Sequence, residues 1–548
     1  MVLQSLDSVP CRHGYNPGFD PTDTSMQPQS LQAWQSAERL LNAQQFDQAS
    51  AAYATLIGDR ELAPMAHLRL SLIAGRQGRL QEATQHAVKA WEARQPDADL
   101  LDMIAKRLFS VGELELAAGV STYDAVLTSR NPVIHAELAK LMSDAMLPEQ
   151  ALVLLRRAME IGLDNGPMRY LLGLSLMQTG DLDGAERELE DALRVEPDFA
   201  HAAWSLAKLR TWTASNNHVE RLRADIARVG ENRQESALFH YALFKELDDL
   251  GRADEAWPVL ETAMRLRRRM VPFDGANAQA LFEYLGAFKG GESDFAKGDG
   301  DATPIFIVGM PRSGTTLLEH MLGAHTQVAD AGELHDFTRQ LRYMANLQGP
   351  PQLDLALAKK SEGIDFAELG RRYLDHTRWR TQDKPYFTDK MPANFLNVGY
   401  IARALPHAKF IHVMRDPMDT CFSNLKEHFA GFYGHTYDQN EMADYYKGYR
   451  QLMAHWRRLY PDRILDVRYG ELTVDTKNVM TEVLEFLGLP FEDAVLDPSA
   501  RSGSVATASA TQVREPIHQR SKEQWRRYEQ QLAPMKERLG SYGYSARS

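Results

Sequence analysis

A repeat of 34 residues runs through the first half of the 548-residue chain. Five short turns of similar composition start at residues 44, 78, 112, 146 and 180. Each turn ends in an alanine, the small residue that a second helix needs where it packs closely against the first: Ala49, Ala83, Ala117, Ala151 and Ala185. A fixed period of this length is typical of a solenoid of helix pairs. The sequence therefore predicts an all-α solenoid over residues 31–285, in a chain long enough for more than one domain.

The sharpest copy of the repeat, residues 166–202, resembles the tetratricopeptide repeat. The positions that carry this resemblance are Leu172, Gly173, Ala185, Ala192 and Pro197. A further copy begins its turn at Gly251, and the copy between the two is degenerate. Stacked helix pairs form a concave surface suited to an extended peptide, but they also serve as spacers and as dimerisation surfaces. The partner of the repeats and any homo-oligomer therefore stay open.

Composition and the first residues limit the classes of protein that fit. Residues 1–30 have no basic start followed by an apolar run, so they read as a loose leader rather than a secretory signal. No window approaches an uninterrupted apolar membrane span, and we expect a cytoplasmic protein. Only Cys11 and Cys421 occur, which argues against a disulfide framework and a zinc site. A net charge of −12 disfavours nucleic acid as a partner.

A second domain is expected after a linker at residues 286–302, where Gly, Lys and Asp dominate. Residues 304–325 of the domain at 303–548 read as strand, loop and helix. The loop "GMPRSGTT" aims backbone N–H groups and the positive end of a helix dipole at an anion. Its glycines, Gly309 and Gly314, allow the tight backbone path, and its hydroxyls offer further hydrogen bonds: Ser313, Thr315 and Thr316. The loop therefore predicts a phosphate site.

This loop lacks the lysine of a nucleoside-triphosphate-binding loop. That lysine would follow the second glycine and reach the terminal phosphates, but Thr315 stands there and the cation is Arg312. The loop suits a phosphate without metal-assisted transfer of a terminal phosphoryl group. No residue cluster in the sequence calls for a metal.

A second strand, loop and helix lies about a hundred residues downstream. The strand is expected at Lys409–Met414, with Arg415 at its carboxyl end and a helix from about Met418. Ser423 lies just over two turns into that helix. Ligands of open α/β sheets bind outside the carboxyl ends of the strands, so Arg415 and the first loop are expected to share one nucleotide.

Together, the two motifs resemble the sulfotransferase family, and within it the branch similar to tyrosylprotein sulfotransferases. The resemblance covers roughly residues 303–530 and implies a P-loop-type α/β domain with a parallel sheet. It implies 3′-phosphoadenosine-5′-phosphosulfate as donor, with no metal. The loop would grip the 5′-phosphosulfate, while Arg415 and Ser423 match the 3′-phosphate site.

The same resemblance implies further site residues. Glu333 is similar to the family's catalytic base, which takes the proton of the acceptor hydroxyl, and His335 is an alternative. Lys390 is similar to a lysine that, with Arg312, stabilises charge on the transferring group. Tyr469, just past a third expected strand, is a candidate nucleotide contact.

The segment near the C-terminus resembles the family's closing loop but departs from it. Ser509 matches a serine that binds the donor and steadies charge during transfer. Gln524 stands where the family has a lysine, which leaves Arg520 or Lys522 as replacements. Glu427 also stands where a basic residue is expected, with Lys426 beside it.

We therefore expect a transferase that moves a sulfuryl group to an acceptor hydroxyl. A tyrosine of a protein or peptide is one candidate acceptor, and glycans and small hydroxylated molecules are others. Two alternatives remain: an interaction scaffold with a catalytically inactive nucleotide-binding domain, and a small-molecule kinase.

Overall fold

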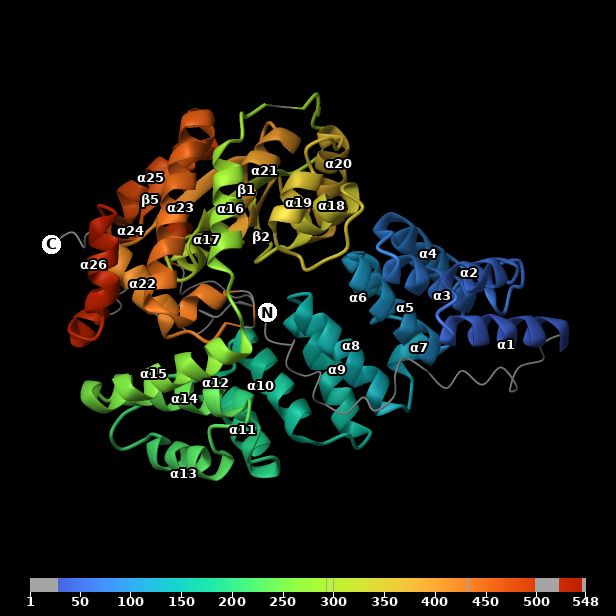
Figure 1. Cartoon of the computed structure of the whole chain (residues 1–548), viewed down its shortest axis with the longest axis horizontal. Coiled ribbons are helices and arrows are strands. Elements are labelled where there is room, and N and C mark those ends of the chain that lie inside the picture. Colours follow the sequence, from blue (N-terminus) through green and yellow to red (C-terminus); the bar gives the residue numbers. More distant parts are fainter. Residues whose placement is uncertain are drawn as a thin grey trace. The chain divides into compact units, whose positions relative to one another are not determined.

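The computed structural model describes residues 28–544 except for residues 292, 299, 430, 432 and 498–521 (Figure 1). Most of the expected leader, with Cys11, lies outside the described residues. Ser509 and Arg520 also lie outside them.

The first part of the chain is helical from residue 28 to residue 286, as the repeat predicts. The second helices of the first five pairs begin at residues 46, 80, 114, 148 and 182, so the period of 34 residues is confirmed. The helices are α1 (Pro28–Asn42), α2 (Phe46–Ala54), α3 (Ala63–Arg76), α4 (Leu80–Glu92), α5 (Ala98–Val111), α6 (Leu114–Val120), α7 (Asp124–Leu127), α8 (Pro132–Asp144), α9 (Pro148–Glu160), α10 (Gly166–Thr179), α11 (Leu182–Val195), α12 (Ala200–Leu209), α13 (Val219–Val229), α14 (Ser236–Asp249), α15 (Ala253–Met270) and α16 (Gly275–Gly286).

The repeat is visible in the backbone of the turns. A residue with positive φ ends the first helix of these pairs: Gln44, Gly78, Gly112, Met146, Gly180 and, in the later copy, Gly251. The N–H of the next residue then donates to a carbonyl five residues earlier, as Arg79 does to Ala74 at 2.9 Å. This pattern satisfies carbonyl groups that the helix end leaves without partners. Glycine adopts the left-handed conformation freely, whereas Gln44 and Met146 hold a Cβ there under strain.

Replacing Gln44 by glycine is expected to raise the free energy of unfolding by about 1 kcal/mol, because the Cβ strain disappears. Gln44 is exposed, so its side chain loses little packing. The reciprocal change, Gly78→Ala, is expected to lower stability by a similar amount, since a Cβ there meets no heavy atom within 4 Å and adds only backbone strain. Urea unfolding of both variants measures the two effects. A stabilised Gly78→Ala protein would contradict this account of the turns.

Small residues allow the paired helices to approach each other. The alanines at the fixed position of each repeat are all buried: Ala49, Ala83, Ala117, Ala151 and Ala185. In the pair α10 and α11, a Cβ added to Gly173 would lie 2.9 Å from Leu189 and 3.3 Å from the carbonyl oxygen of Ala185. A larger residue at this contact would push the two helices apart.

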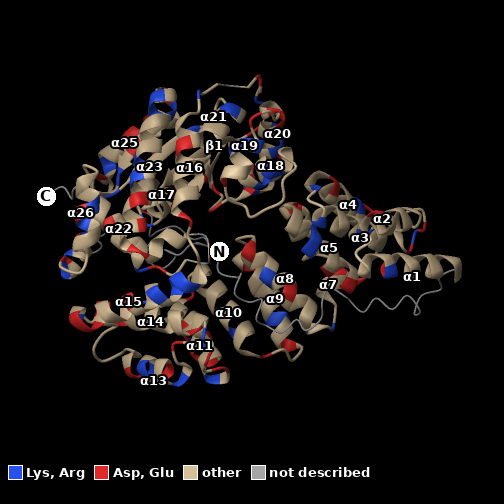
Figure 2. Cartoon of the chain, in the orientation of Figure 1, with Lys and Arg blue, Asp and Glu red and all other residues tan. Residues whose placement is uncertain are grey.

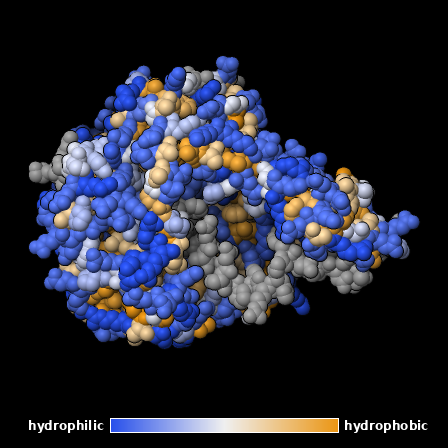
Figure 3. Space-filling model, viewed as in Figure 1, coloured by the Kyte–Doolittle hydropathy of each residue, from blue (hydrophilic) through white to orange (hydrophobic). Residues whose placement is uncertain are grey.

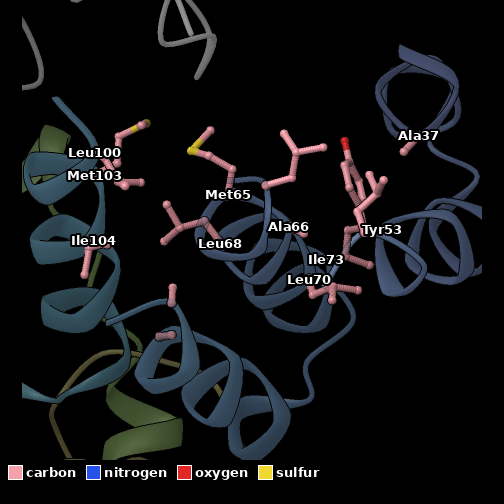
Figure 4. Close-up of a cluster of buried hydrophobic side chains, with 14 of the residues drawn as sticks. Ala37, Tyr53, Met65, Ala66, Leu68, Leu70, Ile73, Leu100, Met103 and Ile104 are labelled. Carbon is pink, nitrogen blue, oxygen red and sulfur yellow. The ribbon is translucent and has the colours of Figure 1, made fainter. Parts of the chain in front are cut away.

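The chain divides into two compact units, and the division falls within the helical array. Of the described residues, the first unit holds 28–163, 336–352 and 360–364. Its core is a cluster of side chains from α1 to α6, including Tyr53, Met65, Ile73 and Ile104 (Figure 4). Helix α18 (Asp336–Met344) belongs to this unit, and the side-chain amide of Gln81 on α4 donates to the carbonyl of Tyr343 at 3.1 Å.

The second unit combines helices α10 to α16 with a five-stranded sheet that is parallel throughout. The strand order is β2-β3-β1-β4-β5. The strands are β1 (Thr303–Gly309), β2 (Val328–Asp330), β3 (Tyr386–Asp389), β4 (Lys409–Met414) and β5 (Ile464–Arg468). The predicted fold class, a helical repeat array followed by a parallel α/β domain, is therefore confirmed.

Helices cover both faces of the sheet, because alternate residues of a strand point to opposite sides. On one face, Ile305 and Ile307 pack with helices α17 and α25. On the other, Phe306 contacts Tyr373 of α20, with ring centroids 5.7 Å apart. Besides α18, the α-helices after β1 are α17 (Thr315–Gly323), α19 (Leu355–Lys360), α20 (Phe366–Thr377), α21 (Val398–Ala404), α22 (Pro417–Leu425), α23 (Gln439–Leu459), α24 (Tyr469–Val474), α25 (Thr476–Leu487) and α26 (Ala533–Ser541).

Charges of both signs are interspersed on the later repeat helices. Lys and Arg stand among Asp and Glu on α11, α13 and α15 (Figure 2), and Arg223 of α13 pairs with Glu255 of α15 at 2.6 Å. The face seen in Figure 3 is mostly hydrophilic, with hydrophobic residues in small scattered groups. Within the described part of the chain, no helix is both long and apolar enough to cross a bilayer.

Candidate active site

Candidate residues from the sequence follow all five strands at the carboxyl edge of the sheet. The phosphate loop follows β1, and Glu333 lies three residues after β2. Lys390, Arg415 and Tyr469 come directly after β3, β4 and β5. Because the strands are parallel, these ends share one edge, where open α/β sheets bind their ligands.

The backbone of the phosphate loop is fixed by close contacts. Gly309 has a φ of +157°, and a Cβ there would lie 2.7 Å from the carbonyl oxygen of Val413 on β4. Gly314 has a φ of +103° and forms the N-cap of α17. Arg312 also has a positive φ, of +66°, a strained conformation of the kind that clusters at functional sites. The loop therefore turns the N-terminus of α17 and its N–H groups toward the edge.

The hydroxyls of the loop are buried, with Thr315 and Thr316 opening the first turn of α17. Among the described residues, the Oγ of Ser313 is buried and has no hydrogen-bond partner. A buried polar atom in this situation costs free energy unless a ligand or water satisfies it. The loop therefore fits an anion that accepts a hydrogen bond from Ser313.

Arg415 and Tyr469 pack on the loop from the neighbouring strands. Arg415 donates from Nη1 to the carbonyl of Arg312 at 3.3 Å, and its guanidinium lies 5.3 Å from the ring centroid of Tyr469. A Cβ at Gly314 would lie only 2.2 Å from that ring, so Tyr469 covers the glycine. Burial lowers the pKa of Arg415, a cost that the Asp419 carboxylate, 3.8 Å away, partly offsets. The structure thus brings Arg312, Arg415 and Tyr469 together.

Glu333 and Lys390 form an ion pair. The fully buried Nζ of Lys390 donates to Oε1 of Glu333 at 2.7 Å and lies 3.6 Å from Oε2 of Glu319 on α17. Burial alone would lower the pKa of Lys390, but Glu333 and Glu319 raise it above its ordinary value. Burial and the neighbouring carboxyl of Asp330 raise the pKa of Glu319 well above its usual range. Two carboxyl groups therefore flank the Lys390 ammonium, and Glu333 makes the shorter contact with it.

Ser423 and Lys426 lie on one face of α22 and its C-cap, since residues three apart share a helix face. Between them, Asn424 donates to the carbonyl of Pro311 at 2.8 Å, which ties α22 to the phosphate loop. Lys426 donates from Nζ to Oε1 of Gln524 at 2.7 Å, on the 3₁₀ helix η10 (Gln524–Tyr528). Lys522, one proposed replacement for the missing lysine, is exposed.

Two contacts of the site were missed by the sequence analysis. Glu319 carried a weak signal, an acid within the apolar helix run "TTLLEHML". Asn424 carried none, because its contact with Pro311 joins residues more than a hundred positions apart. His335, the alternative base, lies two residues after Glu333 and is partly buried.

Family comparisons agree with this architecture. Residues 304–493 match the sulfotransferase family, and residues 35–99 and 147–209 match tetratricopeptide repeats. The chain therefore carries tetratricopeptide repeats followed by a domain of the sulfotransferase family.

Single proteins and structures that are similar to this chain share 21% to 31% sequence identity with it over parts of its length. An uncharacterized protein of Aquifex aeolicus is 31% identical over 377 residues, covering 66% of this chain and 49% of that protein, so the chain spans about half its length. Protein-tyrosine sulfotransferase 1 of Danio rerio is 28% identical over 44% of this chain and 72% of its own. Among solved structures, the sulfotransferase domain of the Synechococcus PCC 7002 olefin synthase aligns over 46% of this chain and all of that domain, at 21% identity and a TM-score of 0.28. The similarity to protein-tyrosine sulfotransferases is distant.

Proposed function

We propose that the chain transfers a sulfuryl group from 3′-phosphoadenosine-5′-phosphosulfate to an acceptor hydroxyl. The observation that carries this proposal is the carboxyl edge of the sheet. There, the loop suited to an anion and the cations beside it lie in the same row of strand ends as the buried Lys390 and its partner Glu333. The match of residues 304–493 to the sulfotransferase family supports the same reading.

The donor's phosphate groups would be held by the loop and the cations beside it. The N–H groups at the start of α17 and the hydroxyls of Ser313, Thr315 and Thr316 suit the 5′-phosphosulfate. Arg312 would contribute its charge, while Arg415 and Ser423 would bind the 3′-phosphate. Tyr469 would keep the loop in shape from above Gly314. We propose Ser509 as a further donor contact from the segment outside the described residues.

Glu333 is the proposed general base. An acceptor hydroxyl must lose its proton as its oxygen attacks sulfur, and a carboxylate within hydrogen-bond reach can take that proton. Lys390, held at 2.7 Å from Glu333, fixes the direction of the carboxylate. A positive charge on Lys390 also suits the oxygens on which negative charge grows during transfer.

A protein or peptide tyrosine is the acceptor class that we propose. The distant relatives named protein-tyrosine sulfotransferases support it, and so do the repeats, whose stacked helices suit an extended peptide. The test is a panel of tyrosine peptides, glycans and small phenols offered with donor carrying radiolabelled sulfur. Transfer to glycans alone would contradict the tyrosine assignment and leave the sulfotransferase proposal intact.

Calorimetric titration with adenosine 3′,5′-bisphosphate, the product nucleotide, tests the donor site. We expect micromolar binding to the full chain, and binding weaker by about tenfold to a hundredfold in Arg415→Ala, the range of a lost charged hydrogen bond. ATP with magnesium is the matched ligand control and is expected to bind poorly, since the loop lacks the lysine for terminal phosphates.

The outcomes separate this proposal from its rivals. Preference for ATP with magnesium would favour a small-molecule kinase. Binding of neither nucleotide would favour an interaction scaffold in which the repeats alone act. Arg415→Ala protein that binds as tightly as wild type would place the nucleotide elsewhere.

A further inference from the structure

We propose that repeat helix α14 completes the donor site: Asp248 positions Lys426, which supplies a cation for the 3′-phosphate of the nucleotide. This inference rests on the proposed function. It assigns to Lys426 the positive charge that is missing at Glu427 and Gln524, where the family has basic residues. It also makes the last repeats part of the nucleotide site rather than an independent module.

Lys426 stands where a phosphate-binding cation is needed. It lies one turn beyond Ser423 on the same face of the helix, with its side chain 21% exposed. Burial lowers the pKa of Lys426; Asp248 opposes this effect, while the guanidinium groups of Arg312, Arg527 and Arg415 add to it. Like charges gathered in this way repel one another, and a bound anion of high charge relieves the repulsion.

Lys426 brings its ammonium group to the position of Gln524, where the family has a lysine. Its side-chain oxygen accepts a hydrogen bond from the Lys426 ammonium at 2.7 Å. A lysine at position 524 would bring a second ammonium to this point. The neutral amide of Gln524 instead accepts a hydrogen bond from Lys426 at the end of α22. The site therefore keeps one lysine at this point, and that lysine comes from α22 rather than from η10.

Asp248 ties both partners of this contact to the repeats. One carboxylate oxygen accepts from the hydroxyl of Tyr528 at 2.8 Å and pairs with Arg527 at 3.0 Å, both on η10. The other lies 3.7 Å from Nζ of Lys426. The carbonyl of Asp248 accepts a further hydrogen bond from Arg527 at 2.9 Å. Asp248 is thus a positioning residue, which fixes η10 and Lys426 relative to each other.

The neighbouring carboxylate on α14 shows that this arrangement is specific. Asp249 is buried to a similar degree, with its side chain 14% exposed against 11% for Asp248. Its contacts stay within the repeats: Lys245 donates to it at 2.6 Å and the N–H of Trp212 at 2.9 Å. The two adjacent acids therefore face different parts of the unit, which makes Asp249 a matched control.

A second repeat helix balances the charge of Glu427, a carboxylate that would compete with the nucleotide for Arg312. Glu427 lies 3.9 Å from Nε of Arg312, close enough to attract the guanidinium away from a phosphate. Lys208 of α12 donates to the other oxygen of Glu427 at 2.5 Å and balances its charge. The repeats therefore act on the loop side as well, through Lys208.

The test compares two ligands that differ by one phosphate group. Adenosine 3′,5′-bisphosphate and adenosine 5′-phosphate are titrated into the full chain and the variants by calorimetry. We expect Lys426→Gln to weaken bisphosphate binding by about tenfold or more, the range of a lost charged hydrogen bond. Monophosphate binding is expected to stay within about twofold, since that ligand lacks the contacted group, and Lys426→Arg should restore much of the loss.

Asp248→Asn is expected to lower the ratio of bisphosphate affinity to monophosphate affinity by about threefold to tenfold. The Lys426 cation stays in this variant, but it loses the carboxylate that positions it. Asp249→Asn should leave the ratio unchanged. A merely structural role for Asp248 would weaken both ligands equally or lower only the melting temperature. Either result overturns the inference for Asp248.

Failure of the inference differs from failure of the proposed function. If wild-type protein prefers the bisphosphate and Lys426→Gln keeps that preference, the inference is wrong and the donor site stands. If wild-type protein binds neither nucleotide, the proposed function is wrong and this inference falls with it.

Discussion

Glu333→Gln protein is expected to lose turnover by about a thousandfold, within the range that general base catalysis contributes. Glutamine keeps the shape of the side chain but cannot accept the acceptor's proton. The product nucleotide does not need that proton transfer, so its affinity should stay within about twofold of wild type. Transfer of radiolabelled sulfur from the donor and calorimetric binding of the bisphosphate give the two readouts.

Glu492→Gln is the matched control for this substitution. Glu492 accepts hydrogen bonds from Thr326, just before β2, whereas Glu333 follows the same strand. Its loss should leave turnover unchanged. Wild-type turnover in the Glu333→Gln protein would sink the assignment and direct attention to His335, two residues further on.

Lys390→Met is expected to lower turnover by about a hundredfold, comparable to removal of one donor from a site that stabilises transition-state charge. Two effects combine, because Lys390 holds Glu333 at 2.7 Å and also brings a positive charge to the proposed site. Methionine fills similar space without the charge. The product bisphosphate lacks the sulfuryl group, so its affinity should change little while turnover falls.

Lys384→Met provides the control from the other end of β3. Lys384 lies two residues before β3 begins and therefore outside the proposed site. Its ammonium donates to the carbonyl of Val328 at 2.9 Å. Its variant should keep wild-type turnover. If both variants lose activity in proportion to a lower melting temperature, Lys390 is a structural lysine and its catalytic assignment is wrong.

Features with local signals could be predicted from the sequence. The 34-residue period follows from turns of fixed length, and strand β4 appears at the predicted Lys409–Met414 because a β-branched apolar run ends there at a charged turn. The placement of Tyr469 directly after a strand was predicted in the same way. The grouping of the site residues could also be predicted, because parallel strands end at the same edge of a sheet and bring the residues that follow them together.

Features that depend on distant contacts could not be predicted. The helix position of Asp248 is visible in the sequence, but its contacts with Tyr528 and Lys426 join segments that only the folded unit brings together. The contact between Glu319 and Lys390 likewise joins a residue of α17 to one that follows β3. The left-handed turn could not be predicted at Gln44 and Met146, because these copies of the repeat lack the glycine that indicates it in the others.

The strand order also sets when the site can form during synthesis. β1 lies between β3 and β4, and its residue Ile305 pairs with Thr388 on one side and Lys409 on the other. The central strand therefore leaves the ribosome well before either neighbour exists, whereas each helix pair of the repeats finds its partner within a few tens of residues. The helix pairs of the repeats can therefore form before the sheet is complete. The proposed nucleotide site would then be complete only after β5 and η10 have been made, long after the helix pairs of the repeats.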